Sequence, residues 1–242
     1  MLKKYARQNQ LNCFSPPVML ATMLIEFGGA IYIMLRYKLN NIGRIIVAFL
    51  VALGVFQLAE YMICEEIGMS GLAWSRIGYV AITLLPPLGI SLALRLANKR
   101  ARLAEVLMYA LCGSFIVYFG FISGAITGQT CQGNYVIFDA HRGAMFLYAM
   151  YYYILMAISG TMCFVWSRKV KDKKRSQALR GLMVGHLVLI IPTATVALLA
   201  PETRAAIPSI MCGFAVFLAI ILLVYVMPRV GMQRNIAKEP KK

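Results

Sequence analysis

Long apolar runs without lysine or arginine constrain the fold of this chain more than any other feature of its sequence. Each run is close to the ~20 residues that an α-helix needs to cross a hydrocarbon core. Of the 242 residues, 60% are hydrophobic and only 14% are charged, which is more apolar and less charged than a soluble domain. The composition excludes a soluble globular domain, a secreted disulfide scaffold and a disordered chain. It predicts an all-α fold, a polytopic membrane bundle.

The sequence predicts seven transmembrane helices. Their expected bounds are Val18–Leu35, Ile42–Cys64, Trp74–Leu94, Ala104–Ile126, Ala144–Trp166, Leu179–Ala200 and Ile207–Met227. The connections after the first, third and fifth helices and the C-terminal tail are rich in Lys and Arg, whereas the other connections are nearly neutral. By the positive-inside rule these basic segments are cytoplasmic and the N-terminus is outside. We therefore expect a short extracytoplasmic segment (1–17), one helical domain (18–227) and a basic cytoplasmic tail (228–242).

Two carboxyl groups lie within the predicted spans. A charged side chain in hydrocarbon is costly, so such a residue is a functional candidate by default. Glu26 has Thr22 on the same helical face, and Glu60 shares its face with Gln57. Both carboxyls are expected in the outer half of the bundle, where they would form a ligand or proton site reached from outside. The structural alternative is a pair of hydrogen-bonded carboxyls that tie helices together.

Tyrosines and one histidine are the next candidates. Tyr148 and Tyr152 share a helical face near the outer end of the fifth span, where they would complete the ligand site or form an interfacial aromatic belt. His186 lies in the cytoplasmic half of the sixth span. It is a candidate proton relay, with a purely packing role as the alternative. His141, in the longest outer connection (residues 127–143), is a weaker candidate for a site there.

Prolines and cysteines add two expectations. Pro86 and Pro87 fall in the middle of the third span and should kink it, leaving carbonyls that need partners. Cys13, Cys64 and Cys131 are all expected at the outer side, where one disulfide among them is plausible and the pairing stays open. There is no C-x-x-C motif and no histidine pair at ligand spacing, so we expect no metal ion and no cofactor.

Four stretches carry a resemblance to a known family. They are Trp74–Leu88, Gly143 with the tyrosine-rich residues after it, Lys174–Gln177 with Gly181, Gly185 and Pro192, and Ile207-Pro208. Together they resemble the N-terminal seven-transmembrane sensor region of some bacterial histidine kinases and diguanylate cyclases. Residues 12–17 and 56–61 are also similar to uncharacterised small bacterial membrane proteins. The sensor resemblance implies a bundle that binds a signal in its outer half and shifts its helices.

The functional hypotheses follow from these features. In the sensor kinases a cytoplasmic output domain follows the membrane region, whereas this sequence ends in a basic tail. We expect a stand-alone sensor or accessory protein of the bacterial inner membrane that signals through a partner. The alternative is a small-solute or proton-coupled transporter that uses Glu26 and Glu60, and a third hypothesis is a lipid-modifying enzyme.

The expected partners are membrane lipids and a signalling protein, while homo-oligomerisation stays open. The net charge of +16 would suggest nucleic acid in a soluble protein. Here membrane topology explains the cations, so we expect no nucleic-acid partner. The sequence has no G-x-S-x-G motif and no Walker A loop, which argues against an enzyme.

Overall fold

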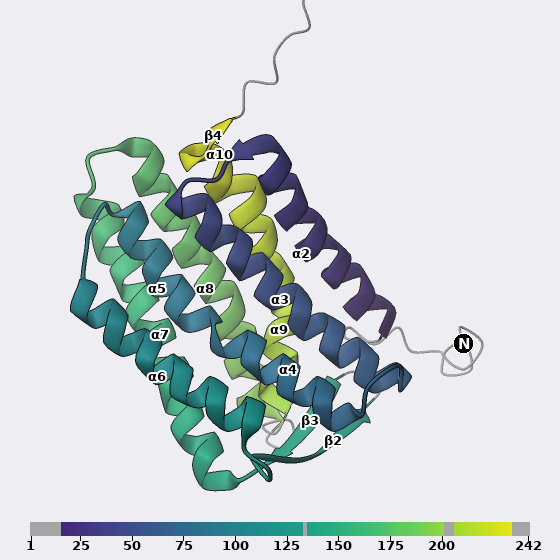
Figure 1. The fold of residues 1–242 in the computed structure, drawn as a ribbon. Coiled ribbons are helices and arrows are strands. Elements are labelled where there is room, and N and C mark those ends of the chain that lie inside the picture. Colours follow the sequence, from purple (N-terminus) through teal and green to yellow (C-terminus); the bar gives the residue numbers. More distant parts are fainter. Residues whose placement is uncertain (1–15, 133–134, 201–205, 234–242) are drawn as a thin grey trace, which may run out of the picture.

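The computed structural model describes residues 16–132, 135–200 and 206–233, and this part contains seven helical segments long and apolar enough to cross a membrane. They form one bundle (Figure 1). The segments are α2 (Pro16–Arg36), α3 (Asn41–Glu65), α4 (Gly71–Thr83) with α5 (Leu85–Leu96), α6 (Arg102–Phe121), α7 (Arg142–Lys169), α8 (Lys173–Leu199), and α9 (Ile207–Ile220) with the π-helical turn η2 (Ile221–Val226) and α10 (Met227–Val230). This confirms the expected helical bundle with seven segments able to cross a membrane.

Two small antiparallel sheets mark the two ends of the bundle. At one end, β1 (Tyr37–Lys38) pairs with β4 (Met232–Gln233). At the other, β2 (Ile126–Gln132) pairs with β3 (Tyr135–Ala140) in a hairpin that packs on α4 and α9 (Figure 1). We call these the basic end and the hairpin end. Every described Lys and Arg except Arg76 and Arg142 lies at or near the basic end.

The hairpin is the main departure from the expected all-helical fold, which left residues 127–143 as a connection. Val136 and Phe138 of β3 are buried, whereas Asp139 is exposed. This alternation is the period of a strand with one covered face. The short length of the segment hid that pattern among the glycines and polar residues around it. The protein is therefore a helical bundle with a small β-cap over one end.

Two predicted helix bounds are wrong. The fourth helix ends at Phe121 and not at Ile126, because Gly124 adopts a positive φ of 85° that turns the chain and Ile126 already belongs to β2. The sixth begins at Lys173 and not at Leu179. Here the carboxylate of Asp172 accepts hydrogen bonds from the first backbone N–H groups and so starts the helix earlier, within the basic segment.

The predicted break in the third span is confirmed. Helix α4 ends at Thr83, and α5 begins at Leu85. Pro87 has no N–H to donate to the carbonyl of Thr83 four residues earlier. Instead, the hydroxyl of Tyr151 on α7 donates to this carbonyl at 2.8 Å, and the thiol of Cys112 on α6 lies 3.5 Å from it. The freed carbonyl thus joins three spans together.

Replacing Tyr151 by phenylalanine tests this junction. We expect the variant to lose about 1–2 kcal/mol of stability, because a buried carbonyl would lose its best donor in an apolar surround. The measurement is the unfolding transition of the purified protein in detergent. Tyr153→Phe is the matched control, because Tyr153 lies on the same helix and is 39% exposed. An equal loss in both variants would contradict the role assigned to Tyr151.

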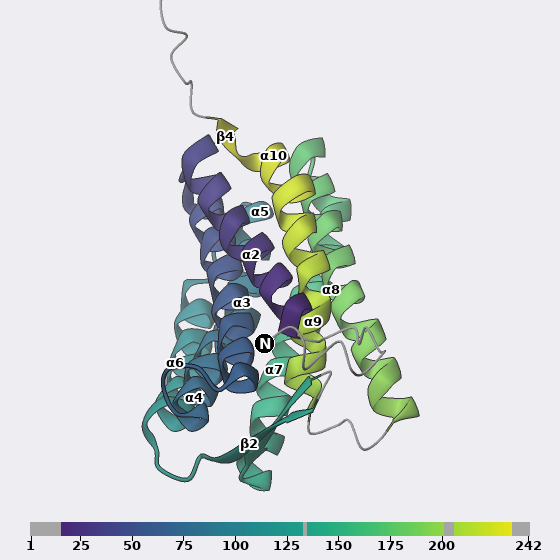
Figure 2. The same ribbon diagram turned by 90° about the vertical axis from the view of Figure 1, so that its right-hand side faces the viewer.

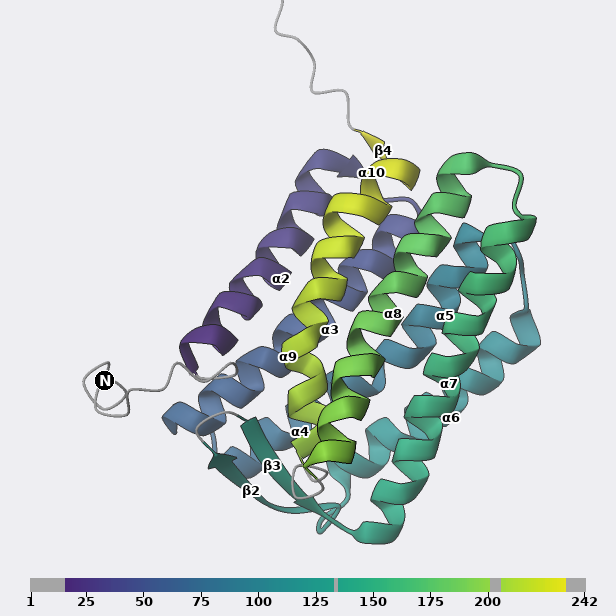
Figure 3. The same ribbon diagram turned by 180° about the vertical axis from the view of Figure 1, so that it is seen from behind.

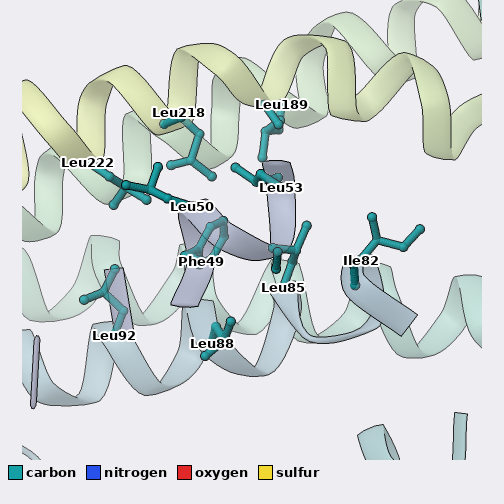
Figure 4. Close-up of a cluster of buried hydrophobic side chains, with 14 of the residues drawn as sticks. Phe49, Leu50, Leu53, Ile82, Leu85, Leu88, Leu92, Leu189, Leu218 and Leu222 are labelled. Atoms are coloured by element: carbon teal, nitrogen blue, oxygen red, sulfur yellow. The ribbon is translucent and has the colours of Figure 1, made fainter. Parts of the chain in front are cut away.

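The main hydrophobic core is continuous and contains a leucine-rich part and an aromatic part. Leucines and Phe49 from α3, α5, α8 and α9 fill the centre of the bundle (Figure 4). Nearer the hairpin end lies an aromatic cluster composed of Tyr79, Phe115, Phe119, Phe138 and Tyr148. Because Phe138 belongs to β3, this cluster fixes the hairpin onto the helices.

Candidate functional site

The candidate site lies between α2, α3 and α9, close to the hairpin end. Helix α2 packs against both α3 and α9 (Figures 2 and 3). It contributes Glu26, while α3 contributes Gln57 and Glu60, and all three side chains are at most 2% exposed. We call the space around them the carboxyl chamber. Its cavity of about 10 Å³ is lined by Val18, Met19, Thr22, Gln57, Glu60, Ser209 and Gly213, which is about the room that one water molecule occupies.

The polar atoms of the carboxyl chamber are short of partners. Among the described residues, none forms a hydrogen bond with either carboxyl oxygen of Glu26, with Nε2 of Gln57 or with Oε1 of Glu60. Glu26 is close enough to Glu60 for the charges of the two groups to interact. Buried polar groups in proteins are nearly always hydrogen-bonded. Four unpartnered atoms on three neighbouring side chains therefore indicate a binding site for a small ligand.

No positive side chain neutralises this pair within the described part of the chain. The ion pairs found there join Arg95 to Glu105 and Arg175 to Asp172, both near the basic end. When two carboxyl groups are buried together without a cation, ionising both of them has a high free-energy cost. The chamber is thus suited to bind protons or a small cation.

A serine connects the chamber to the hairpin. Ser209, in the first turn of α9, is 2% exposed and accepts a hydrogen bond of 3.1 Å from the backbone N–H of Val136 in β3. Its side chain also lines the chamber together with Glu60. Ser209 was not among the residues predicted from the sequence. The available signal was a lone serine inside an apolar run, directly after Pro208.

A disulfide bond between Cys64 and Cys131 fixes the other edge of the hairpin. Cys64 lies one helical turn after Glu60 on α3, and Cys131 lies in β2. The structure thus resolves the pairing that the sequence left open, while Cys13 lies outside the described residues. The hairpin is attached on one side by this covalent bond and on the other by Ser209, which lines the chamber.

The two tyrosines predicted for the ligand site lie elsewhere. Tyr148 on α7 accepts a hydrogen bond of 3.2 Å from the hydroxyl of Thr83. Both Tyr148 and Tyr152 line a separate, larger cavity between α7 and α9. Of the six residues proposed for the ligand site, Thr22, Glu26, Gln57 and Glu60 come together, while the two tyrosines are on the other side of α9. The Thr22 hydroxyl itself donates to the carbonyl of Met19 at 2.9 Å.

The two histidines are also apart from the chamber. His186 is buried, and its Nδ1 lies 2.7 Å from the carbonyl of Leu182 in its own helix. The ring borders a cavity of about 20 Å³ in the centre of the bundle, and a role as relay stays a prediction. His141 is exposed and precedes α7.

The fold and the chamber together define a multi-pass helical membrane protein with a buried carboxyl pair under a disulfide-bonded cap. Comparison with models of protein families, with curated proteins and with solved structures finds no match. The resemblance to bacterial sensor regions therefore stays a prediction.

Proposed function

We propose that the protein is a membrane sensor that binds protons or a small monovalent cation in the carboxyl chamber and passes the signal to a partner protein at its basic end. The observation that carries this proposal is the unpartnered atoms of Gln57 and Glu60 at a buried space the size of one water molecule, with the unpartnered carboxyl of Glu26 close enough for its charge to interact with that of Glu60. Larger ligands do not fit a cavity of that size. The resemblance to sensor regions supports the same proposal.

We propose further that the hairpin end faces outward from the cytoplasmic membrane of a bacterium. The described cations gather at the opposite end, as the positive-inside rule expects for the cytoplasmic side. The disulfide at the hairpin end also fits the oxidising side of such a membrane. In this orientation the chamber binds its ion from the solution outside the membrane. The basic segments before and after Lys173 are available to a cytoplasmic partner.

A cation- or proton-coupled transporter is the second candidate, because the same carboxyl pair could carry its coupling ion. Transporters often expose backbone carbonyls at broken helices to bind ions. In this protein the Thr83 carbonyl at the break in the third span is occupied by Tyr151 and Cys112. The hairpin next to the chamber is also held in place by Ser209 and by the disulfide. Both features favour a sensor, which binds an ion and returns it to the same side, over a transporter, which releases the ion on the other side of the membrane.

The test measures ligand-dependent stability in lipid nanodiscs. Sodium, lithium and potassium chloride are compared with choline chloride at equal ionic strength, and the pH is varied in parallel. We expect one of the small cations, or the pH, to shift Tm, because a ligand at 100 times its Kd adds about 2.7 kcal/mol of stability. The double variant Glu26→Gln/Glu60→Gln should lose this response. Glu105→Gln, which removes a carboxyl near the basic end, should retain it.

Flux measurements separate the two candidate functions. The protein reconstituted in liposomes should move neither sodium nor protons down an imposed gradient if it is a sensor, and the same sample should still show the shift in Tm. Flux that the double variant abolishes would favour the transporter. A Tm that responds to neither cations nor pH, or a double variant that responds like the wild type, would overturn the assignment of the chamber.

A further inference from the structure

A second cavity, larger and of the opposite character, lies between α7 and α9. Its volume is about 430 Å³, which is within the range of sites for small organic ligands. We call it the lateral pocket. It is lined by Ile82, Met145, Phe146, Tyr148, Ala149, Tyr152, Tyr153, Ile207, Pro208, Met211 and Cys212. None of these side chains is charged, so the pocket selects an apolar occupant.

The course of α8 leaves this pocket open. Helix α8 packs against both α7 and α9. Pro192 lies inside it, and none of its residues after Thr193 is buried. In Figure 2 this last part of α8 leans away from α9. None of the residues that line the lateral pocket belongs to α8.

The pocket reaches the lipid-facing surface. Phe146 and Tyr153 at its rim are 66% and 39% exposed, whereas Tyr148 and Tyr152 are at most 5% exposed. All the residues that line it belong to membrane-spanning segments. An occupant therefore enters from the hydrocarbon region, and the most abundant molecules there are the acyl chains of the bilayer lipids.

Among the described residues, one cation lies beyond the end of the pocket that faces the hairpin end. Arg142 begins α7, and Met145, Phe146 and Ala149 follow it at spacings of three, four and seven residues, which places all four on one helical stripe. Arg142 is exposed, and within the described part of the chain it forms no ion pair. A cation one turn beyond an apolar pocket matches a molecule with an anionic head and an apolar chain.

From these observations we propose that the lateral pocket binds one acyl chain of an anionic membrane phospholipid, whose phosphate contacts Arg142. This site is distinct from the carboxyl chamber. Ser209 and Gly213 of α9 line the chamber, while Pro208 and Met211 line the pocket, so α9 is the wall between them. The proposal does not depend on the function assigned to the chamber.

The test uses phosphatidylglycerol with a photoreactive diazirine in one acyl chain. The protein in phosphatidylcholine nanodiscs containing a trace of this probe is irradiated, and the labelled residues are identified by mass spectrometry. We expect labelling to concentrate on Tyr152, Tyr153 and Met211 and to be displaced by unlabelled phosphatidylglycerol. Equal, non-displaceable labelling of exposed residues elsewhere, such as Phe217 on α9, would show ordinary lipid contact and overturn the proposal.

Two variants test the two halves of the site. Ala149→Trp fills the pocket and should lower labelling there about tenfold. Ala157→Trp places the same side chain on an exposed part of α7 and should leave labelling unchanged. Arg142→Gln should reduce the preference for phosphatidylglycerol over phosphatidylcholine about fivefold, because one cation near an anionic lipid contributes roughly that much. The displacement experiment on the wild type decides the proposal even if Ala149→Trp fails to fold, and an unchanged preference in Arg142→Gln would exclude the contact with the phosphate.

Discussion

Replacing Tyr79 by alanine is expected to lower the free energy of unfolding by about 3–5 kcal/mol, the usual cost of removing a large buried aromatic side chain. Tyr79 is completely buried. Its ring centroid lies 4.7 Å from that of Phe119, 5.2 Å from that of Phe138 and 5.8 Å from that of Tyr148. These rings belong to α6, β3 and α7, so the substitution leaves a cavity where the hairpin joins the helices. Denaturant unfolding in detergent measures the loss.

Tyr79→Phe is the control for this prediction. The Tyr79 hydroxyl has only a weak contact, 3.8 Å from the sulfur of Met145, so the phenylalanine variant should lie within about 1 kcal/mol of the wild type. If alanine and phenylalanine had the same effect, the hydroxyl rather than ring packing would be responsible. If neither had an effect, the aromatic cluster would not be part of the stabilising core.

Removing the disulfide is expected to have the second largest effect. The double variant Cys64→Ser/Cys131→Ser should lose about 2–4 kcal/mol, because the bond closes a long loop between two otherwise separate segments. Hydrogen exchange at the hairpin backbone, residues 126–132 and 135–140, should accelerate, while the helices at the basic end stay protected. Thermal unfolding and exchange mass spectrometry on the same sample provide both readings.

A chemical reductant supplies the control for the disulfide. It should reproduce the loss in the wild-type protein and have no effect on the double variant. The free cysteines of the described chain, Cys112, Cys163 and Cys212, are buried and should contribute nothing to the difference. Wild-type protein that carries free thiols at Cys64 and Cys131 after purification without reductant would contradict the bond itself.

The sequence predicts the spans well because hydrophobicity over twenty residues is a property of each helix alone. The predicted helix ends are wrong where a single side chain or turn determines the residue at which a helix begins or ends. Asp172 extends α8 into a basic segment, and Gly124 ends the fourth span early. The hairpin depends on pairing between two short strands, and strand pairing is not encoded by hydropathy.

The site was predictable only within single helices. Helical periodicity placed Thr22 with Glu26 and Gln57 with Glu60, and in the structure Thr22, Gln57 and Glu60 line one chamber while the charge of Glu26 interacts with that of Glu60. Which helices become neighbours depends on packing between distant segments. That is why Ser209 was missed and why Tyr148 and Tyr152, predicted to join the carboxyl site, line a separate cavity. Tyr151, which was not among the candidate residues, donates the hydrogen bond to the free carbonyl of Thr83 at the break in the third span.

The pairing of Cys64 with Cys131 also imposes an order on the biogenesis of the protein. The chain between the two cysteines contains α4, α5 and α6, so the translocon must thread two complete spans before the second thiol reaches the side of the first. Oxidation of Cys64 and Cys131 can then only follow the insertion of these spans into the membrane. The newly made bundle therefore exists for a time without the disulfide that attaches its hairpin. In the orientation proposed above, the hairpin is therefore fully attached only after both spans have been inserted and the disulfide has formed.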